Sequence, residues 1–254
     1  KQFRGREVSS ATLGVIGLGN VGSKVANAGV YLGMHVMGYD PYIKVKNAWE
    51  IQKDVYKVAD VNDIFSNADF ITIHTPATDE TAEMIGAEAI ALAKDGVIIL
   101  NYAREEVVDV DAIKAGLDSG KIAAYATDFA VPELAGYDNV LLTPHIGGTT
   151  DRAEANCAMM AADSLIRFLE TGEIRNAVNF PDVAMTLVSP YRLSIINRNI
   201  PNMVGLISTA TTRAPSRASL RVMAWPMPVP APVTIAVLPV NLMLMVPAPG
   251  WLSP

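Results

Sequence analysis

The glycine-rich segment behind the first predicted strand constrains the fold of this chain more than any other feature. The apolar residues 12–16 run directly into Gly17, Gly19 and Gly22, a G-x-G-x-x-G pattern. In such a turn the first glycine permits the tight bend, the second lets backbone amides approach a pyrophosphate, and the third lets helix and strand pack closely. The helix that follows adds partial positive charge at its N-terminus. The segment therefore predicts a strand–turn–helix unit that binds a dinucleotide.

The residues after the turn extend this unit to a second strand. Residues 20–33 are compatible with a helix, and residues 34–39 predict a strand. Asp40 ends that strand, 18 residues after Gly22, where an acidic side chain would bond a ribose 2′-hydroxyl. The plain alternative is that Asp40 and Pro41 only make a turn. The context on both sides favours the dinucleotide site.

Apolar and helical segments alternate from residue 55 to residue 143. Strands are predicted over residues 55–58, 68–74, 96–101, 122–127 and 139–143. Helices are predicted from Asp60 to residue 65, twice between residues 78 and 93, and from Asp109 to Gly120, since Asp is a preferred N-cap and Gly a preferred terminator. This alternation predicts an α/β fold with a doubly wound parallel sheet of the Rossmann type.

A longer helix is predicted from Thr150 to about residue 170, with Gly172 ending it. Cys157 lies near one stripe of this helix together with Ala161 and Leu165, so we expect it to be a small buried side chain. It is the one cysteine of the chain, which excludes an internal disulfide and fits the reducing cytoplasm. The charged start of the chain, residues 1–7, predicts no secretory leader.

Charge and proline content differ sharply between the two ends of the chain. The net charge is −6, but residues 183–254 hold five arginines and no acid, so the rest carries 15 basic and 26 acidic residues. An acidic body argues against nucleic acid as a partner. From residue 209 onward nine prolines predict an unstructured tail. Its apolar pieces are shorter than the roughly 18 residues that span a membrane, so no membrane association is expected.

Three histidines could carry chemistry. We expect His35, on the second strand, to be structural. His74 ends a strand at the edge where doubly wound folds bind ligands, so it either shapes the cofactor pocket or simply ends the strand. His145 lies in a loop framed by Pro144 and two glycines after the last strand, and a proton-transfer role is favoured over a packing role.

Two charged residues stand near the same edge. Arg104 follows the strand 96–101 and could hold a substrate carboxylate, or could form a surface ion pair with Glu105 or Glu106. Glu133 lies in the loop after Asp128, where a solvated loop acid is the plain alternative. Spacing alone does not join Arg104, Glu133 and His145, and no cluster with metal-ligand spacing is present in the sequence.

Several segments together resemble the D-isomer-specific 2-hydroxyacid dehydrogenases over roughly residues 1–208. They are residues 17–22, 38–41, 74–76 with 80–81, 103–104 with 108–109, and 143–147. The resemblance implies NAD as cofactor and a small-molecule substrate. It also implies that Arg104 binds the substrate carboxylate, Glu133 orients His145, and His145 exchanges the proton, while Asp128 contacts the nicotinamide side. The cofactor site that it implies comprises Gly17, Gly19, Asn20, Val21, Gly22, Asp40, His74, Thr75, Pro76, Ala103, Arg104, Asp128, His145, Gly147 and Gly148.

Within this family the chain looks most like the phosphoglycerate dehydrogenases. Residues 174–181 match them, and residues 191–205 resemble the opening strand and helix of a regulatory ACT domain. The implied reaction is the oxidation of D-3-phosphoglycerate to 3-phosphohydroxypyruvate in serine biosynthesis. The alternatives are another D-2-hydroxyacid, of the hydroxypyruvate, glyoxylate or D-lactate type, and a non-catalytic NAD-binding fragment or sensor.

The resemblance divides the chain into a crossover segment (1–10), an NAD-binding domain (11–150), a return helix toward a substrate lobe (151–182), an ACT-like start (183–208) and the tail (209–254). The flanking domains are thus expected only as remnants, and the family's segment before the nucleotide domain is absent. Glu105 replaces a glycine that usually follows the arginine. We therefore expect NAD binding with slow turnover or none. The family implies a homodimer or larger oligomer for the full-length protein.

Limited proteolysis tests the predicted tail. We expect cleavage to remove residues after about 209 first, because a segment with this proline density forms neither a helix nor a central strand. The measurement is mass spectrometry of the products over time. A protease-resistant C-terminal fragment would contradict the prediction.

Overall fold

The computed structural model describes residues 7–177, 180, 182–184, 191–193 and 245–247. The chain divides into two units, Lys1–Thr150 and Asp151–Pro254, which are described separately. Most of the expected ACT-like start and tail, and residues 1–6 of the crossover segment, lie outside the described residues.

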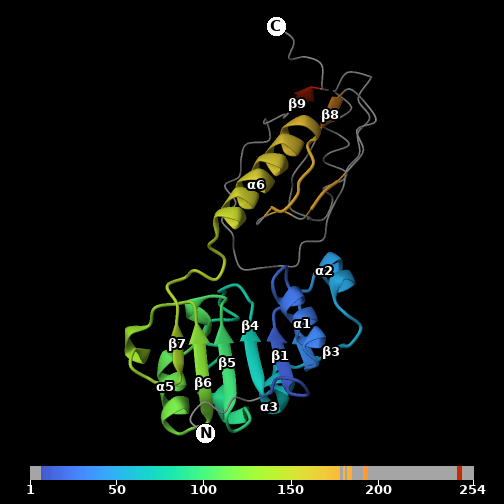
Figure 1. The fold of residues 1–254 in the computed structure, drawn as a ribbon. Helices are drawn as coiled ribbons and strands as arrows, with labels where there is room; N and C mark the ends of the chain where they lie inside the picture. The colour runs from blue at the N-terminus through green and yellow to red at the C-terminus, as the bar shows by residue number, and fades with distance from the viewer. Residues whose placement is uncertain (1–6, 178–179, 181, 185–190, 194–244, 248–254) are drawn as a thin grey trace. The chain divides into compact units, whose positions relative to one another are not determined.

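The first unit is built on a seven-stranded sheet in which every pairing is parallel (Figure 1). The strands are β1 Thr12–Ile16, β2 His35–Tyr39, β3 Val55–Lys57, β4 Phe70–Ile73, β5 Val97–Asn101, β6 Ile122–Thr127 and β7 Val140–Leu142. The α-helices are α1 Gly22–Tyr31, α2 Val45–Glu50, α3 Val61–Asn67, α4 Ala87–Leu92 and α5 Val110–Asp118, and the short 3-10 helices are η1 Glu105–Val107 and η2 Pro132–Leu134. The order β3-β2-β1-β4-β5-β6-β7 confirms the predicted doubly wound sheet.

Helices cover both faces of this sheet, as successive residues of β1 show. Leu13 belongs to one core cluster, and a Cβ placed on Gly29 of α1 would lie 2.7 Å from its side chain. The next residue, Gly14, faces α3, because its Cβ would lie 2.3 Å from Ile64 Cγ2. Neighbouring residues of a strand point to opposite faces. The central strand is therefore buried on both sides, which explains its continuous apolar sequence.

Two connections differ from the sequence-based expectation. Helix α2 forms where a loop was expected after Asp40. Between residues 78 and 93 only α4 forms, so the prediction of two helices is wrong. The hydroxyl of Thr81 donates to Pro76 O at 2.6 Å and the Thr78 amide donates to that hydroxyl at 2.9 Å. Such local side-chain bonds stabilise a turn at the expense of a helix.

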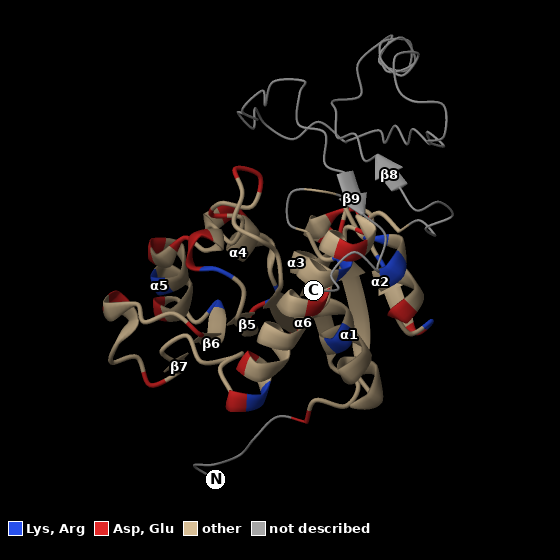
Figure 2. Cartoon of the chain, turned by 90° about the horizontal axis from the view of Figure 1, so that it is seen from above, with Lys and Arg blue, Asp and Glu red and all other residues tan. Residues whose placement is uncertain are grey.

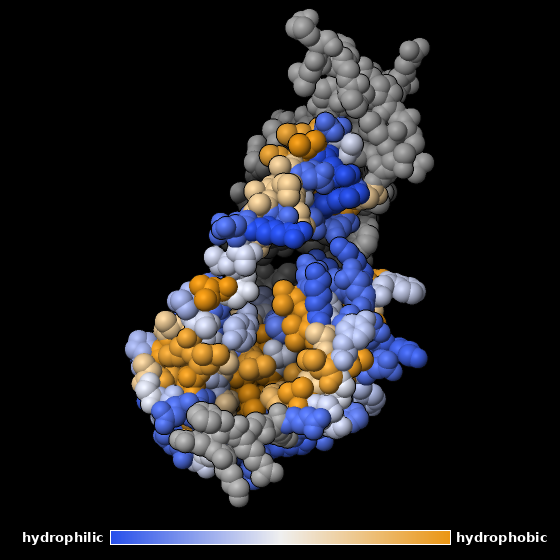
Figure 3. Space-filling model, in the orientation of Figure 1, coloured by the Kyte–Doolittle hydropathy of each residue, from blue (hydrophilic) through white to orange (hydrophobic). Residues whose placement is uncertain are grey.

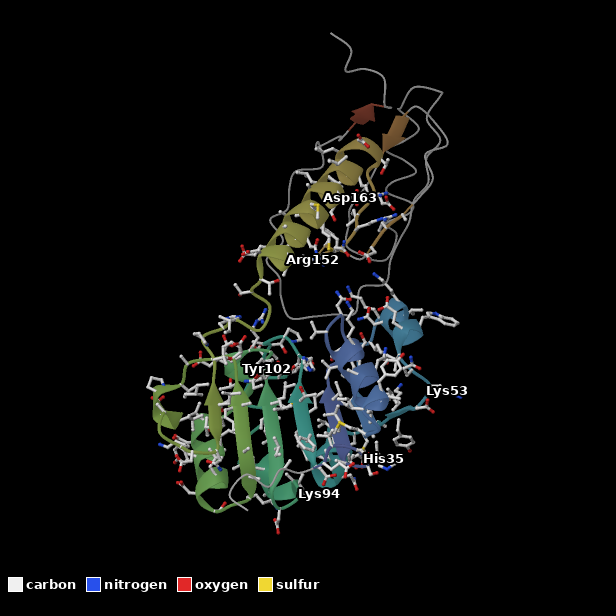
Figure 4. All side chains as sticks on the ribbon, viewed as in Figure 1. His35, Lys53, Lys94, Tyr102, Arg152 and Asp163 are labelled. Carbon is white, nitrogen blue, oxygen red and sulfur yellow. The ribbon has the colours of Figure 1, made fainter. Side chains whose placement is uncertain are left out.

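The topology brings the carboxyl ends of all seven strands to one edge of the sheet. Figure 4 shows this arrangement, with Tyr102 at that edge, after β5, and His35 and Lys94 at the opposite edge. The strand order reverses between β1 and β4, and ligands of doubly wound sheets bind in the crevice at such a point. On the face seen in Figure 3, hydrophobic side chains gather in patches across the middle of this unit, with hydrophilic side chains toward its margins.

The second unit contains the helix α6 Asp151–Thr171 and the antiparallel pair β8 Tyr191–Leu193 and β9 Met245–Pro247. The predicted start of α6 after Thr150 is confirmed. The prediction that Cys157 is buried is wrong, since Cys157 is exposed and no residue of α6 is buried. An apolar stripe is buried only where another element covers it, and periodicity alone does not show whether one does. No described helix combines the length and apolar character needed to cross a membrane.

The packing of β1 on α3 gives a stability prediction. We expect Gly14→Ala to lower the free energy of unfolding by about 1–3 kcal/mol, because the added methyl group overlaps Ile64 in a packed core. The matched control is Gly19→Ala, whose Cβ would meet no atom within 4 Å and should change stability by less than about 0.5 kcal/mol. Urea unfolding followed by circular dichroism measures both. Equal stability of the two variants would contradict the prediction.

Candidate cofactor and active site

The glycine turn after β1 is packed tightly against the start of the loop after β4. Gly17 has a positive φ of 89°, and a Cβ on it would lie 2.7 Å from His74 O. A Cβ on Gly22 would lie 1.8 Å from Gly17 O. Gly17 N donates to Tyr39 O at 2.8 Å, and His74 N donates to Ile16 O at 2.7 Å. The turn is therefore held by β2 on one side and by β4 on the other, without room for side chains at its first and third glycines.

The turn presents backbone amides to an open space at the start of α1. Within residues 7–177 no protein acceptor bonds the amides of residues 19–22. A Cβ on Gly19 would meet nothing within 4 Å, and the first turn of α1 carries no acidic side chain. Donors directed into open space at a helix N-terminus form a site for an anion such as a pyrophosphate.

Asp40 is fixed at the end of β2. Its Oδ2 accepts a hydrogen bond from Leu18 N at 2.8 Å, and its Oδ1 accepts one from Tyr42 N at 2.8 Å. The carboxylate is thus oriented beside the glycine turn, with lone pairs left for a ribose hydroxyl. Lys44 and Lys46 follow it in the chain, and α2 carries basic residues in Figure 2.

His74 and Thr75 form the wall after β4. The Nε2 of His74 lies 3.0 Å from Thr72 Oγ1, and burial lowers the pKa of His74 below its ordinary value. The hydroxyl oxygen of Thr75 is buried and meets no hydrogen-bond partner among the described residues. Buried polar atoms of proteins nearly always have partners. An unpartnered hydroxyl beside the glycine turn fits a polar group of a bound cofactor.

The loop after β5 is held by a residue that the sequence analysis did not single out. Asn101 is 1% exposed; its Oδ1 accepts from Ala103 N at 3.1 Å and its Nδ2 donates to Arg104 O at 2.9 Å. The guanidinium of Arg104 donates to Ala103 O at 2.7 Å. No described carboxylate forms an ion pair with Arg104, so the alternative of a pair with Glu105 or Glu106 is not realised. The sequence signal for Asn101 was a polar residue ending an apolar strand.

The loop after β7 places His145 against the segment that follows β6. The ring of His145 packs edge-on against Phe129, with centroids 5.1 Å apart, and its φ is 57°. Asp128 is the residue directly after β6 and directly before Phe129. Its carboxylate accepts hydrogen bonds from the Ile146 and Gly147 amides. The structure therefore brings Asp128, His145 and Gly147 together.

Glu133 lies on η2, between β6 and β7. Glu133 and His145 are both exposed, and no hydrogen bond joins them in the part of the chain that the structure describes. The orienting role of Glu133 therefore stays a prediction, as do the roles of Arg104 and His145. Among the described residues, no group of three or more His, Cys, Asp or Glu side chains is arranged to hold a metal ion.

Comparison with known proteins agrees with this geometry. Residues 1–147 match the model for the NAD binding domain of the D-isomer specific 2-hydroxyacid dehydrogenases. The chain belongs to this family. The first unit is thus an NAD-binding domain, and the amides of the glycine turn, the Asp40 carboxylate and the Thr75 hydroxyl fit that cofactor.

Several relatives in this family are D-3-phosphoglycerate dehydrogenases. The enzyme of Methanocaldococcus jannaschii is 38% identical over 202 residues, covering 76% of this chain and 38% of its own length. The Escherichia coli K12 enzyme is 34% identical over 211 residues, covering 78% of this chain and 50% of its own length. This chain therefore spans half or less of the length of these relatives.

Solved structures of the family share the fold. The Aquifex aeolicus D-lactate dehydrogenase complexed with NAD and lactic acid superposes with a TM-score of 0.58 at 31% identity, covering 66% of this chain and 56% of that one. A D-2-hydroxyisocaproate dehydrogenase gives a TM-score of 0.60 at 31% identity, covering 67% and 56%.

The position of Asp40 predicts a preference for NADH over NADPH. We expect at least about tenfold tighter binding of NADH, roughly 1.4 kcal/mol, because a carboxylate beside the ribose repels a 2′-phosphate. Asp40→Ser should reduce this ratio, whereas Asp63→Asn, an equal charge change at an exposed position of α3, should not. Fluorescence titration of both reduced cofactors measures the ratio. Equal or tighter NADPH binding by the unchanged protein would remove this role from Asp40.

Burial of His74 predicts a pH dependence of stability. The pKa of His74 is lower in the folded chain, so the unfolded chain binds a proton at this imidazole more readily. The free energy of unfolding therefore falls as the pH drops below about 6.5, the pKa of an unperturbed histidine, toward the folded-state pKa. We expect His74→Gln to flatten the decline of Tm between pH 7 and 5. His35→Gln, at an exposed position of β2, should keep it. An unchanged slope in His74→Gln would show that burial does not hold this imidazole neutral.

Proposed function

We propose that this chain supplies the NAD-binding and proton-transfer part of an enzyme that oxidises D-3-phosphoglycerate to 3-phosphohydroxypyruvate. The observation that carries this proposal is the extent of similarity to D-3-phosphoglycerate dehydrogenases. The family model for the NAD-binding domain covers residues 1–147, whereas the matches to the first four of these relatives span 190 to 211 residues. The narrower resemblance therefore includes sequence beyond the cofactor domain, where residues 174–181 lie.

The residues at the carboxyl edge are assigned complementary roles in this reaction. NAD, when bound, accepts the hydride from C2 of the substrate. Arg104, with no described carboxylate as partner, binds the substrate carboxylate and stabilises charge on the developing carbonyl oxygen. His145 accepts the proton of the C2 hydroxyl, and Glu133 favours the charged form of His145.

The remaining parts of the chain are assigned by the same resemblance. We take α6 as the helix that leads back toward a substrate lobe, and residues 183–208 as the start of an ACT-like domain. The full-length protein is proposed to act on a small-molecule substrate as a homodimer or larger oligomer.

One observation favours a second candidate, a non-catalytic NAD-binding protein. Glu105 directly follows Arg104, is exposed, and pairs with no basic group among the described residues. A negative charge at this position opposes the binding of an anionic substrate. Turnover separates the two candidates.

The test compares substrates and one variant. We expect slow NADH formation at alkaline pH, with a higher kcat/KM for 3-phosphoglycerate than for D-lactate, glycolate or D-glycerate. His145→Ala should lower kcat by about 100-fold or more and leave NADH affinity within a few fold, because general acid–base catalysis contributes roughly 10²–10⁴. A preference for another hydroxyacid would refute the proposed substrate. Tight NADH binding with no turnover of any substrate would establish the second candidate.

A further inference from the structure

The carboxylate of Asp128 binds the loop that carries His145. Asp128 follows β6, is 4% exposed, and accepts three hydrogen bonds from the segment after β7. Its Oδ1 accepts from Thr143 Oγ1 at 2.5 Å and from Ile146 N at 2.9 Å, and its Oδ2 accepts from Gly147 N at 2.7 Å. Both oxygens of this buried acid are therefore used to connect two loops.

The three donors lie on both sides of His145 in the chain. Thr143 is two residues before it, and Ile146 and Gly147 follow it directly. His145 itself has a φ of 57°, in the left-handed region that side-chain-bearing residues rarely adopt. A strained conformation persists only where its surroundings impose it. The bonds to Asp128 constrain the residues on either side, and the ring of Phe129, the neighbour of Asp128, packs against the imidazole.

The contact at Gly147 leaves no space for a side chain. A Cβ on Gly147 would lie 2.8 Å from Asp128 Oδ2 and 3.3 Å from Tyr102 Cδ1. A Cβ on the adjacent Gly148 would meet nothing within 4 Å. The loop backbone can therefore approach the carboxylate this closely only with glycine at position 147, whereas position 148 has room for a side chain.

We propose that Asp128 is a positioning residue for the reaction, which holds His145 in its left-handed conformation against Phe129 by accepting hydrogen bonds from Thr143, Ile146 and Gly147. This inference rests on the proposed function for the role of His145 as proton acceptor. It is additional to the cofactor contact that the family resemblance implies for Asp128, since three protein donors already bond this carboxylate and all three come from the loop of His145. The acidic residue that connects to the histidine loop is Asp128 and not Glu133.

The charge of Asp128 suits this role. The hydrogen bond from Thr143, with those from Gly147 and Ile146, holds the pKa of Asp128 below its ordinary value. The carboxylate is therefore ionised at neutral pH, and an ionised carboxylate only accepts hydrogen bonds. An asparagine in its place offers one acceptor oxygen and turns an NH₂ group toward a donor. Asp128→Asn thus removes part of the connection while keeping the side-chain shape.

Imidazole NMR tests the positioning without any need for turnover. The chain has three histidines, so the ring signals of His35, His74 and His145 can be assigned by single substitutions. We expect Asp128→Asn to move the His145 signals away from their ring-current-shifted position beside Phe129, and to leave those of His35 and His74 in place. Gly147→Ala should do the same, and Thr143→Val should move the His145 signals in the same direction by less. Gly148→Ala should leave them near their original position.

Kinetics tests the consequence for the reaction. If positioning is the role, Asp128→Asn lowers kcat by about 100-fold, the size expected for a misplaced catalytic group, while NADH affinity changes by less than about threefold. The control is Asp69→Asn at the opposite edge of the sheet, where Asp69 Oδ2 accepts from Thr12 N at 2.8 Å. This control removes a comparable carboxylate and should keep both kcat and the His145 signals.

The outcomes separate this inference from the proposed function. Unmoved His145 signals in a folded Asp128→Asn protein overturn the positioning role, whatever the activity. Weakened NADH binding without movement of His145 also overturns it and assigns Asp128 to the cofactor. Absence of turnover in the unchanged protein refutes the proposed function, whereas the NMR result still decides whether Asp128 holds the loop.

Discussion

The close backbone contact between the glycine turn and β4 is the constraint on which the rest of this domain depends. Gly17 and Gly22 have no space for a Cβ, because His74 O and Gly17 O lie where such atoms would be. This contact seats the start of α1 directly over the carboxyl ends of β1 and β4. The free amides of the turn, the Asp40 carboxylate and the Thr75 hydroxyl thus lie near the point where the strand order reverses, which is where doubly wound sheets bind ligands.

The same edge of the sheet uses buried polar side chains to fix its loops. Asn101 closes the loop that carries Arg104, and Asp128 closes the loop that carries His145. Both are almost fully buried, at 1% and 4% exposure, whereas Arg104 and His145 are exposed. Buried polar groups with satisfied hydrogen bonds hold backbone segments rigidly. The exposed residues are thereby placed by partners that are themselves almost fully buried.

The buried residues that fix the loops and the exposed residues that the loops carry bear on different conclusions about the chain. Membership of the 2-hydroxyacid dehydrogenases rests on the NAD-binding domain as a whole. In the function that we propose, the substrate depends on fewer groups, chiefly Arg104 and the charge of its neighbour Glu105. Because a cofactor site made of backbone amides tolerates changes in exposed loops, one domain of this kind can serve several hydroxyacids. Under this proposal, substrate specificity is expected to depend on the exposed residues more than on the core.

The sequence by itself determined the α/β class and the alternation of seven strands with helices. It also determined the positions of the glycine turn and of Asp40, because periodicity and turn chemistry act over a few residues. It did not determine that the segment after Thr78 makes a turn, that α2 forms, or that Cys157 is exposed. Those depend on which side chain bonds a nearby backbone group and on which element covers a helix. Tertiary structure alone decided that Asp128 bonds residues on both sides of His145, since residues 15 to 19 positions apart meet only when parallel strands bring their carboxyl ends together. It also decided that, among the described residues, no hydrogen bond joins Glu133 to His145.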